Sequence, residues 1–121
     1  MTFFTQREGQ LHVEGLALEQ IANACGTPCY VYSRAALEAA YRAYDEALAG
    51  CDHLICYAVK ANSNQEIIKT LFSLGASFDV ASYNEFMQVY EYIKNSFGNK
   101  MSQSLFPLHF SKTKNLKKMI M

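Results

Sequence analysis

One lysine and one aspartate occupy similar places in two short apolar segments. Lys60 follows the first segment, 54–59, and Asp79 lies inside the second, 77–81. If both segments are strands, alternation places Lys60 on the same face as Ala58, and it places Asp79 among small residues. We therefore predict that Lys60 and Asp79 face each other at the carboxyl ends of two parallel strands, where α/β proteins bind ligands.

A lysine in such a place suits imine formation with an aldehyde cofactor. The amine is nucleophilic only when neutral, and removal from water favours the neutral form. A small neighbour such as Ala58 leaves room for a planar aromatic aldehyde, usually pyridoxal phosphate, and a carboxylate can balance a protonated imine. The same pattern fits a structural alternative, in which Lys60 only ends a strand and forms an ion pair with Asp79.

Two short motifs predict where helices begin after these segments. The stretches 63–66 (SNQE) and 82–85 (SYNE) have the pattern of a capping box, in which serine and glutamate side chains bond to backbone N–H groups. Apolar residues at spacings of three and four follow each motif, as in a helix with one buried side. Earlier in the chain, Ser33 is a suitable N-cap for a helix that continues to Ala49.

The predicted elements alternate along the chain. Strands are expected at 29–32, 54–59, 77–81 and 105–110, and helices at 16–25, 33–49, between 63 and 75, behind the motif at 82–85 and from 116 onward. Residues 95–103 are polar and are expected to form a loop. This order predicts an α/β fold with a parallel sheet and right-handed crossovers. Three such units do not close a barrel, for which about 250 residues are needed, so we expect the opening portion of a larger architecture.

Composition narrows the functional class. The 121 residues carry 11 basic and 11 acidic side chains, and half are apolar, as in a globular protein. A neutral balance without a basic stripe argues against nucleic acid as the main partner. We find neither a long apolar run for a membrane helix nor a secretory signal, so we expect a cytoplasmic location and no membrane partner.

The cysteines and charges give two further expectations. The cysteines at 25, 29, 51 and 56 match neither a zinc-ribbon nor a thioredoxin spacing, so we expect reduced thiols and no metal, a disulfide or metal pair being the alternative. Residues 1–62 carry 4 basic and 7 acidic groups, a net of −3, and residues 63–121 carry 7 and 4, a net of +3. Either a domain boundary or a chain joined from two sources explains this drift, and the lack of a linker disfavours the boundary.

Three motifs resemble, in the same order, those of the fold-type III decarboxylases that use pyridoxal phosphate. They are GTPCYVYS at 26–33, YAVKAN at 57–62 and GASFDVAS at 75–82. The similarity extends from about residue 10 to 94 and is strongest to the diaminopimelate decarboxylase family of lysine biosynthesis. The resemblance implies the amino-terminal part of an alanine racemase-like (β/α)8 barrel, roughly three βα units, with an N-terminal segment and helix at 1–28 and the partial barrel at 29–121.

The resemblance also implies roles for individual residues. Lys60 matches the catalytic lysine that binds pyridoxal 5'-phosphate, and Asp79 and Ala58 match residues beside that cofactor. Glu85 matches a supporting glutamate, although the capping box already explains it. The family's phosphate loop, cofactor-stacking histidine and C-terminal domain follow later in its chains, and His109 comes too early for the stacking position. The resemblance further implies an enzyme that removes carbon dioxide from a small amino acid and that works as a homodimer.

Other functions remain open at this level. The stretch ASYNEF at 81–86 is closer to the ornithine and arginine decarboxylase branch than to the glycine-containing version of the diaminopimelate branch. A truncated, non-catalytic relative that binds the cofactor, or a cofactor carrier of the same barrel type, would share YAVKAN. We expect the 121-residue chain alone to form little imine and to release no carbon dioxide from diaminopimelate.

Overall fold

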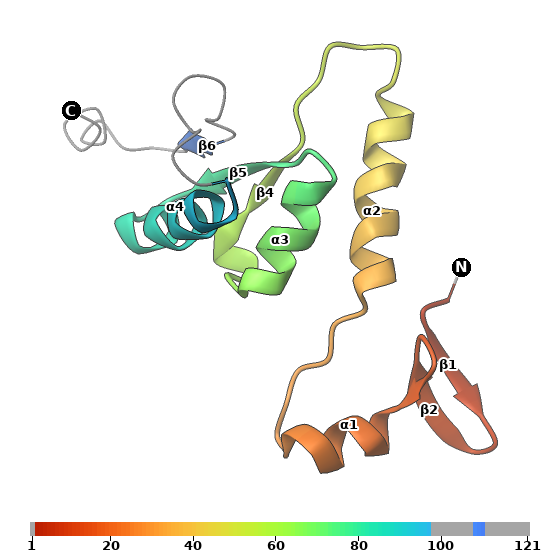
Figure 1. The fold of residues 1–121 in the computed structure, drawn as a ribbon. Helices are drawn as coiled ribbons and strands as arrows, with labels where there is room; N and C mark the ends of the chain where they lie inside the picture. The colour runs from red at the N-terminus through yellow and green to blue at the C-terminus, as the bar shows by residue number, and fades with distance from the viewer. Residues whose placement is uncertain (1, 98–107, 111–121) are drawn as a thin grey trace.

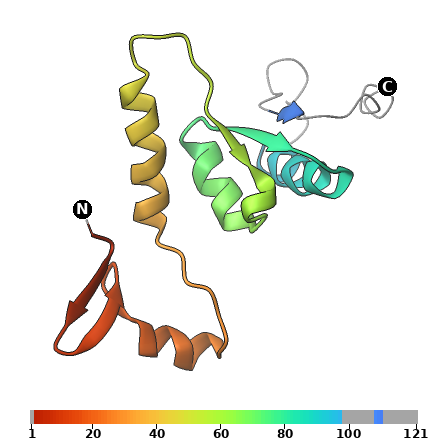
Figure 2. The ribbon, with the colours of Figure 1, turned by 180° about the vertical axis from the view of Figure 1, so that it is seen from behind.

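The computed structural model describes residues 2–97 and 108–110. Within this part of the chain, an antiparallel β-hairpin and a short helix come first, and a parallel α/β unit follows (Figure 1). The view from behind shows the same division, with one long helix, α2 (Arg34–Ala47), standing beside the α/β unit (Figure 2). The described residues therefore form two sheets, and the candidate site lies at the parallel one.

The first sheet was not anticipated from the sequence. It contains β1 (Phe4–Arg7), β2 (Gln10–Val13) and β3 (Leu16–Ala17), paired antiparallel in that order. Glu8 and Gly9 join the first two strands with φ angles of 51° and 80°. A two-residue hairpin turn of type I′ needs positive φ at both of its central residues. This turn is favoured because its twist matches the twist of the two strands.

Two expectations about the following segment have different outcomes. Helix α1 (Leu18–Cys25) follows β3 and is shorter than predicted, because residues 16–17 belong to the sheet. The strand expected at 29–32 is wrong, since these residues form no regular element. Tyr30 is 93% exposed there, and no described strand lies against the segment to complete a ladder.

The second sheet has the predicted alternating organisation. It contains β4 (Cys56–Ala58), β5 (Ser77–Val80) and β6 (Leu108–Phe110), which are parallel and lie in that order. Helices α3 (Gln65–Ser73) and α4 (Tyr83–Phe97) follow the first two strands, and α4 continues into the expected loop. The helix expected from 116 onward lies outside the described residues. The α/β class is thus confirmed, as an open portion of a sheet.

The core lies between the parallel sheet and its helices. Its buried side chains are Val59, Ile67, Ile68, Leu71, Ala76, Phe78, Val80, Val89 and Ile93. Phe78 is central, because its ring lies 6.5 Å from Tyr57 and 6.4 Å from Phe72. Leu37 and Tyr41 of α2 pack against this core from outside, so the long helix is anchored to the α/β unit.

The helix caps agree with the sequence in two cases of three. Ser33 accepts a hydrogen bond from the Ala36 N–H at 3.0 Å, so it caps α2 as predicted. Ahead of α4, the Ser82 hydroxyl accepts from the Glu85 N–H at 3.2 Å. The carboxylate of Glu85 accepts from the Ala81 N–H at 2.7 Å, one residue before the Ser82 N–H that a capping box would use, so both side chains of the motif bond to backbone N–H groups at the helix start.

The capping box at 63–66 is wrong. Asn64 caps α3, with its side-chain oxygen accepting the Glu66 N–H at 2.9 Å. The Glu66 carboxylate turns outward and lies 3.8 Å from Lys69. Asparagine is as good an N-cap as serine, and here the helix begins one residue later than the motif implied.

The carboxylate of Glu14 fastens the first sheet to the start of α2. It accepts hydrogen bonds from the Ser33 hydroxyl at 2.7 Å and from the Ala35 N–H at 3.0 Å. These bonds, the backbone one first, lower the pKa of Glu14 from its ordinary 4.5. A lowered pKa means that the carboxylate stabilises the docked hairpin above pH 4.5 and that this contribution is lost as the pH falls through the folded value.

We expect the amide proton of Ala35 to report this titration in NMR spectra. Its chemical shift should change with a midpoint below 4.5, and Glu14→Gln should abolish the change. Glu46→Gln, at an exposed position of the same helix, is the matched control and should leave the midpoint in place. A midpoint at or above 4.5 in the unaltered chain would contradict the assigned bonding.

Candidate active site

Two of the predicted site residues are neighbours across the parallel sheet. Ala58 is the last residue of β4, and its Cα pairs with that of Asp79 in β5. Asp79 pairs in turn with His109 of β6, so Asp79 lies on the middle strand of the sheet. Because partners in register share a face, the small side chain of Ala58 and the carboxylate of Asp79 belong to the same face near the carboxyl edge.

Lys60 lies just beyond this pair but not on the strand. The strand ends at Ala58, and Val59–Ala61 form a short 3-10 turn, η1, which carries Lys60. The alternation argument therefore does not apply to Lys60, whose direction depends on the turn. Lys60 is exposed, so the burial that would favour a neutral amine is not supplied by the described residues.

The turn that carries Lys60 is held at both of its ends. Val59 is 1% exposed and belongs to the core. The hydroxyl of Tyr57 donates a hydrogen bond to the carbonyl oxygen of Asn62 at 3.0 Å and so spans the turn. A tyrosine of ordinary pKa, 10.0, is already protonated at neutral pH, and burial raises the pKa of Tyr57 further, so its hydroxyl is a donor there. Sequence reasoning missed this contact, although both residues flank Lys60 in the YAVKAN motif.

Glu85 and Cys56 occupy supporting places around the pair. Glu85 bonds to the loop after β5, where its carboxylate accepts a hydrogen bond from the Ala81 N–H. Cys56 begins β4 and pairs in register with Ser77, on the same strands as Ala58 and Asp79. The ordinary pKa of a cysteine, 9.0, already favours the neutral thiol at pH 7, and burial, and next the charge of Asp79, raise the pKa of Cys56 further.

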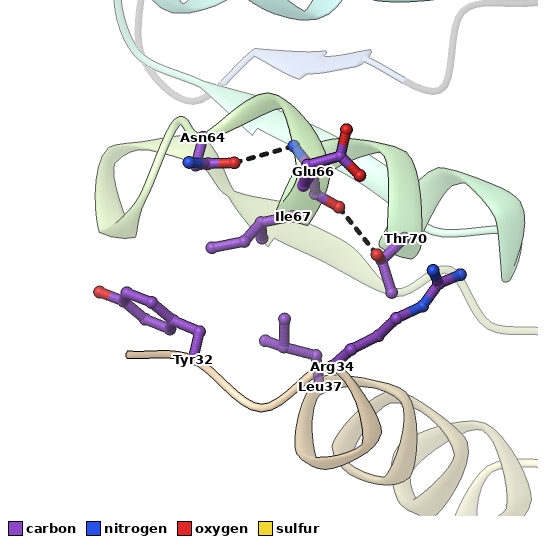
Figure 3. A pocket seen from close by; sticks show the side chains of 7 residues that line it. All are labelled: Tyr32, Arg34, Leu37, Asn64, Glu66, Ile67 and Thr70. Atoms are coloured by element: carbon purple, nitrogen blue, oxygen red, sulfur yellow. Dashed lines mark hydrogen bonds between the residues drawn. The ribbon is translucent and has the colours of Figure 1, made fainter. Parts of the chain in front are cut away.

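Two cavities lie near the site, both against α2. One, of about 310 Å³, is apolar and is bordered by Ala58 and Ala61 on either side of Lys60, and by Tyr41 and Tyr44 of α2. The other, of about 170 Å³, lies between the starts of α2 and α3 (Figure 3). Its lining residues are Tyr32, Arg34, Leu37, Asn64, Glu66, Ile67 and Thr70. Lys60 and Asp79 line neither, so the candidate site is an edge of the sheet and not one of these hollows.

The residues present fit one half of a pyridoxal phosphate site. Lys60 offers an amine that can condense with an aldehyde, and the Asp79 carboxylate and the small side chain of Ala58 lie on the two adjoining strands. No group of three or more metal-ligating side chains occurs in the described residues. Across the same part of the chain, all four cysteines are free, and no helix has the length and apolar character to span a membrane.

Comparison with known proteins agrees with this chemistry. The family described as "Pyridoxal-dependent decarboxylase, pyridoxal binding domain" matches residues 34–97. Diaminopimelate decarboxylase of Pseudomonas aeruginosa is 54% identical over 89 residues, which are 74% of this chain and 21% of that enzyme. The enzyme of Vibrio cholerae is 49% identical over 90 residues, again 74% of this chain and 22% of the relative. The chain thus spans about a fifth of the length of these relatives.

Solved structures share the fold of the same portion. The crystal structure of AQ1208 from Aquifex aeolicus matches with a TM-score of 0.70 and 40% identity, covering 74% of this chain and 22% of that one. Diaminopimelate decarboxylase from M. jannaschii matches with a TM-score of 0.70 and 29% identity, covering 75% and 22%. The chain therefore belongs to the pyridoxal-dependent decarboxylase family and corresponds to part of its pyridoxal-binding domain.

Proposed function

We propose that this chain supplies the lysine-bearing part of a pyridoxal-phosphate-dependent decarboxylase that converts meso-diaminopimelate to L-lysine. The proposal is carried by the place of Lys60, directly beyond the Ala58–Asp79 register pair, inside a segment half identical to diaminopimelate decarboxylases. A structure of the M. jannaschii enzyme in complex with L-lysine supports the choice of product. The ornithine and arginine branch is less well supported, because the relatives at 42–54% identity are diaminopimelate decarboxylases.

Each site residue has a task in this reaction. Pyridoxal phosphate, when bound, supplies the aldehyde that condenses with an amine and the ring that takes up the electron pair left by carbon dioxide. Lys60 provides the amine and must lose a proton from Nζ before it attacks. Asp79 provides a negative charge that balances a proton held on that nitrogen, and Ala58 leaves room for the ring.

The remaining features of the proposal concern the larger assembly. We assign residues 29–121 to a partial alanine racemase-like (β/α)8 barrel and residues 1–28 to a separate N-terminal segment. A cytoplasmic homodimer with an amino acid as its substrate is the form in which we expect the enzyme to work. An alternative is a relative that binds the cofactor without turnover.

A hybrid enzyme tests the proposed function. Residues 1–97 of this chain would replace the matching portion of the Pseudomonas aeruginosa enzyme, to which the chain is 54% identical over 89 residues. We expect the hybrid to bind pyridoxal phosphate and to release carbon dioxide from meso-diaminopimelate, but not from ornithine or arginine. The unaltered 121-residue chain, assayed in parallel, should release none. A folded, cofactor-loaded hybrid without turnover would refute the proposal.

A further inference from the structure

The turn that carries Lys60 is too short to fix a side chain by itself. It comprises three residues, Val59–Ala61, and a 3-10 turn of this length has few internal hydrogen bonds. Its first residue, Val59, is anchored in the core, but Lys60 and Ala61 are exposed. Whatever holds the far end of the turn therefore restrains the backbone from which the Lys60 side chain extends.

Tyr57 holds the far end of the turn, at Asn62. Its ring packs edge-on against the fully buried Phe78, with centroids 6.5 Å apart and planes at 88°. From this fixed position its hydroxyl donates to the Asn62 carbonyl oxygen at 3.0 Å, across five residues of chain. The bond therefore ties the residue after the turn to the strand before it, and Lys60 lies inside the loop that it closes.

Asn62 passes the restraint on to helix α3. Its side-chain oxygen accepts the Asn64 N–H at 2.9 Å, and the side-chain oxygen of Asn64 accepts the Glu66 N–H at 2.9 Å. The next residue, Ile67, is buried in the core. A continuous series of hydrogen bonds thus joins the ring of Tyr57, the end of the lysine turn and the first turn of a packed helix.

We infer that Tyr57 is a positioning residue for Lys60, which it holds at the carboxyl edge of the sheet by clamping Asn62. This inference rests on the proposed function, in which the Lys60 amine condenses with pyridoxal phosphate. The amine must be placed accurately for this condensation. A misplacement of about 1 Å lowers the rate of a reaction between aligned groups on the order of a hundredfold. In this role Tyr57 acts through the turn, by its bond to the Asn62 carbonyl oxygen.

Tyr57→Phe removes the hydroxyl and keeps the ring on Phe78. Tyr92→Phe is the matched control, because Tyr92 is a half-buried tyrosine of the same ring cluster, 6.4 Å from Phe72. Each variant would be made in the hybrid enzyme described above, mixed with pyridoxal 5'-phosphate under native conditions, reduced with borohydride and digested, and the adduct at each lysine measured by mass spectrometry. We expect Tyr57→Phe to lower the adduct at Lys60 about tenfold relative to the other lysines, and Tyr92→Phe to leave this ratio unchanged.

Amide hydrogen exchange separates this inference from the proposed function. Exchange of the Asn64 amide should become faster in Tyr57→Phe, while β5 and the core of α4 keep their protection. Equal Lys60 ratios in both variants, or unchanged exchange at Asn64 in Tyr57→Phe, would overturn the positioning role. If the hybrid without either substitution shows no preference for Lys60, the proposed function fails, and the exchange measurement still decides whether Tyr57 clamps the turn.

Discussion

Replacing Lys60 by alanine in the hybrid enzyme should lower decarboxylation of meso-diaminopimelate by more than about a thousandfold, as the loss of a nucleophile does in enzymes that act through a covalent bond. Alanine has no amine to hold the cofactor or exchange it with the substrate. The effect should appear in kcat, because Lys60 takes part in the chemical steps, and the visible absorbance of the bound imine should disappear as well.

A second lysine controls for the loss of charge and of methylene groups. Lys69 lies on the outer side of α3, is 54% exposed and pairs with Glu66 at 3.8 Å. Lys69→Ala should keep kcat within about twofold, because an exposed ion pair of this kind contributes little to stability. Turnover by Lys60→Ala close to that of the unaltered hybrid would remove Lys60 from the role that we assign to it.

Periodicity in the sequence identified much of the α/β unit. The apolar residues at helical spacing behind the motif at 82–85 include Val89 and Ile93, which are both buried in the core. Ser33 and Ser82 were correctly identified as helix caps, whereas at 63–66 the same signal failed, because the neighbouring Asn64 caps the helix instead of Ser63. Local signals of this type survive folding because tertiary packing reinforces them.

The errors have a common physical origin in partners that are distant along the chain. The apolar run at 29–32 has strand-like composition, but a strand needs a neighbour, and the described sheets provide none beside it. The first hairpin carries a weak alternation, and its turn uses Glu8-Gly9 where asparagine before glycine would have been a stronger signal. Glu14 bonds to a helix start some twenty residues later, which no local pattern predicts.

The types of the site residues were more predictable than their positions. Small residues before a lysine indicated imine chemistry, and the register places Ala58 next to Asp79. Strand alternation nevertheless placed Lys60 wrongly on the face of a strand. The strand ends at Ala58, and Lys60 lies in the turn that follows. The hydrogen bond from Tyr57 to Asn62 forms because the turn brings the Asn62 carbonyl oxygen back to the tyrosine hydroxyl. The residue types alone do not encode this return of the chain.

Phe78→Ala should lower the free energy of unfolding by about 3–5 kcal/mol, the usual cost of removing a buried phenylalanine ring. Phe78 is 0% exposed on the middle strand of the parallel sheet, and the rings of Tyr57 and Phe72 lie about it at 6.5 and 6.4 Å. A small domain is stable by only about 5–15 kcal/mol, so this one change removes a large share of its stability. Urea denaturation followed by circular dichroism would measure it.

Two further variants assign the loss to the packing of this ring. Phe78→Leu fills most of the space and should cost less than the alanine variant, whereas Tyr30→Ala should change stability by no more than about 0.5 kcal/mol, because Tyr30 is 93% exposed. A loss below about 1 kcal/mol in Phe78→Ala would contradict the core described above. Because the ring of Tyr57 rests on Phe78, the alanine variant should also release the turn of Lys60, so amide protection at Asn64 should fall together with global stability.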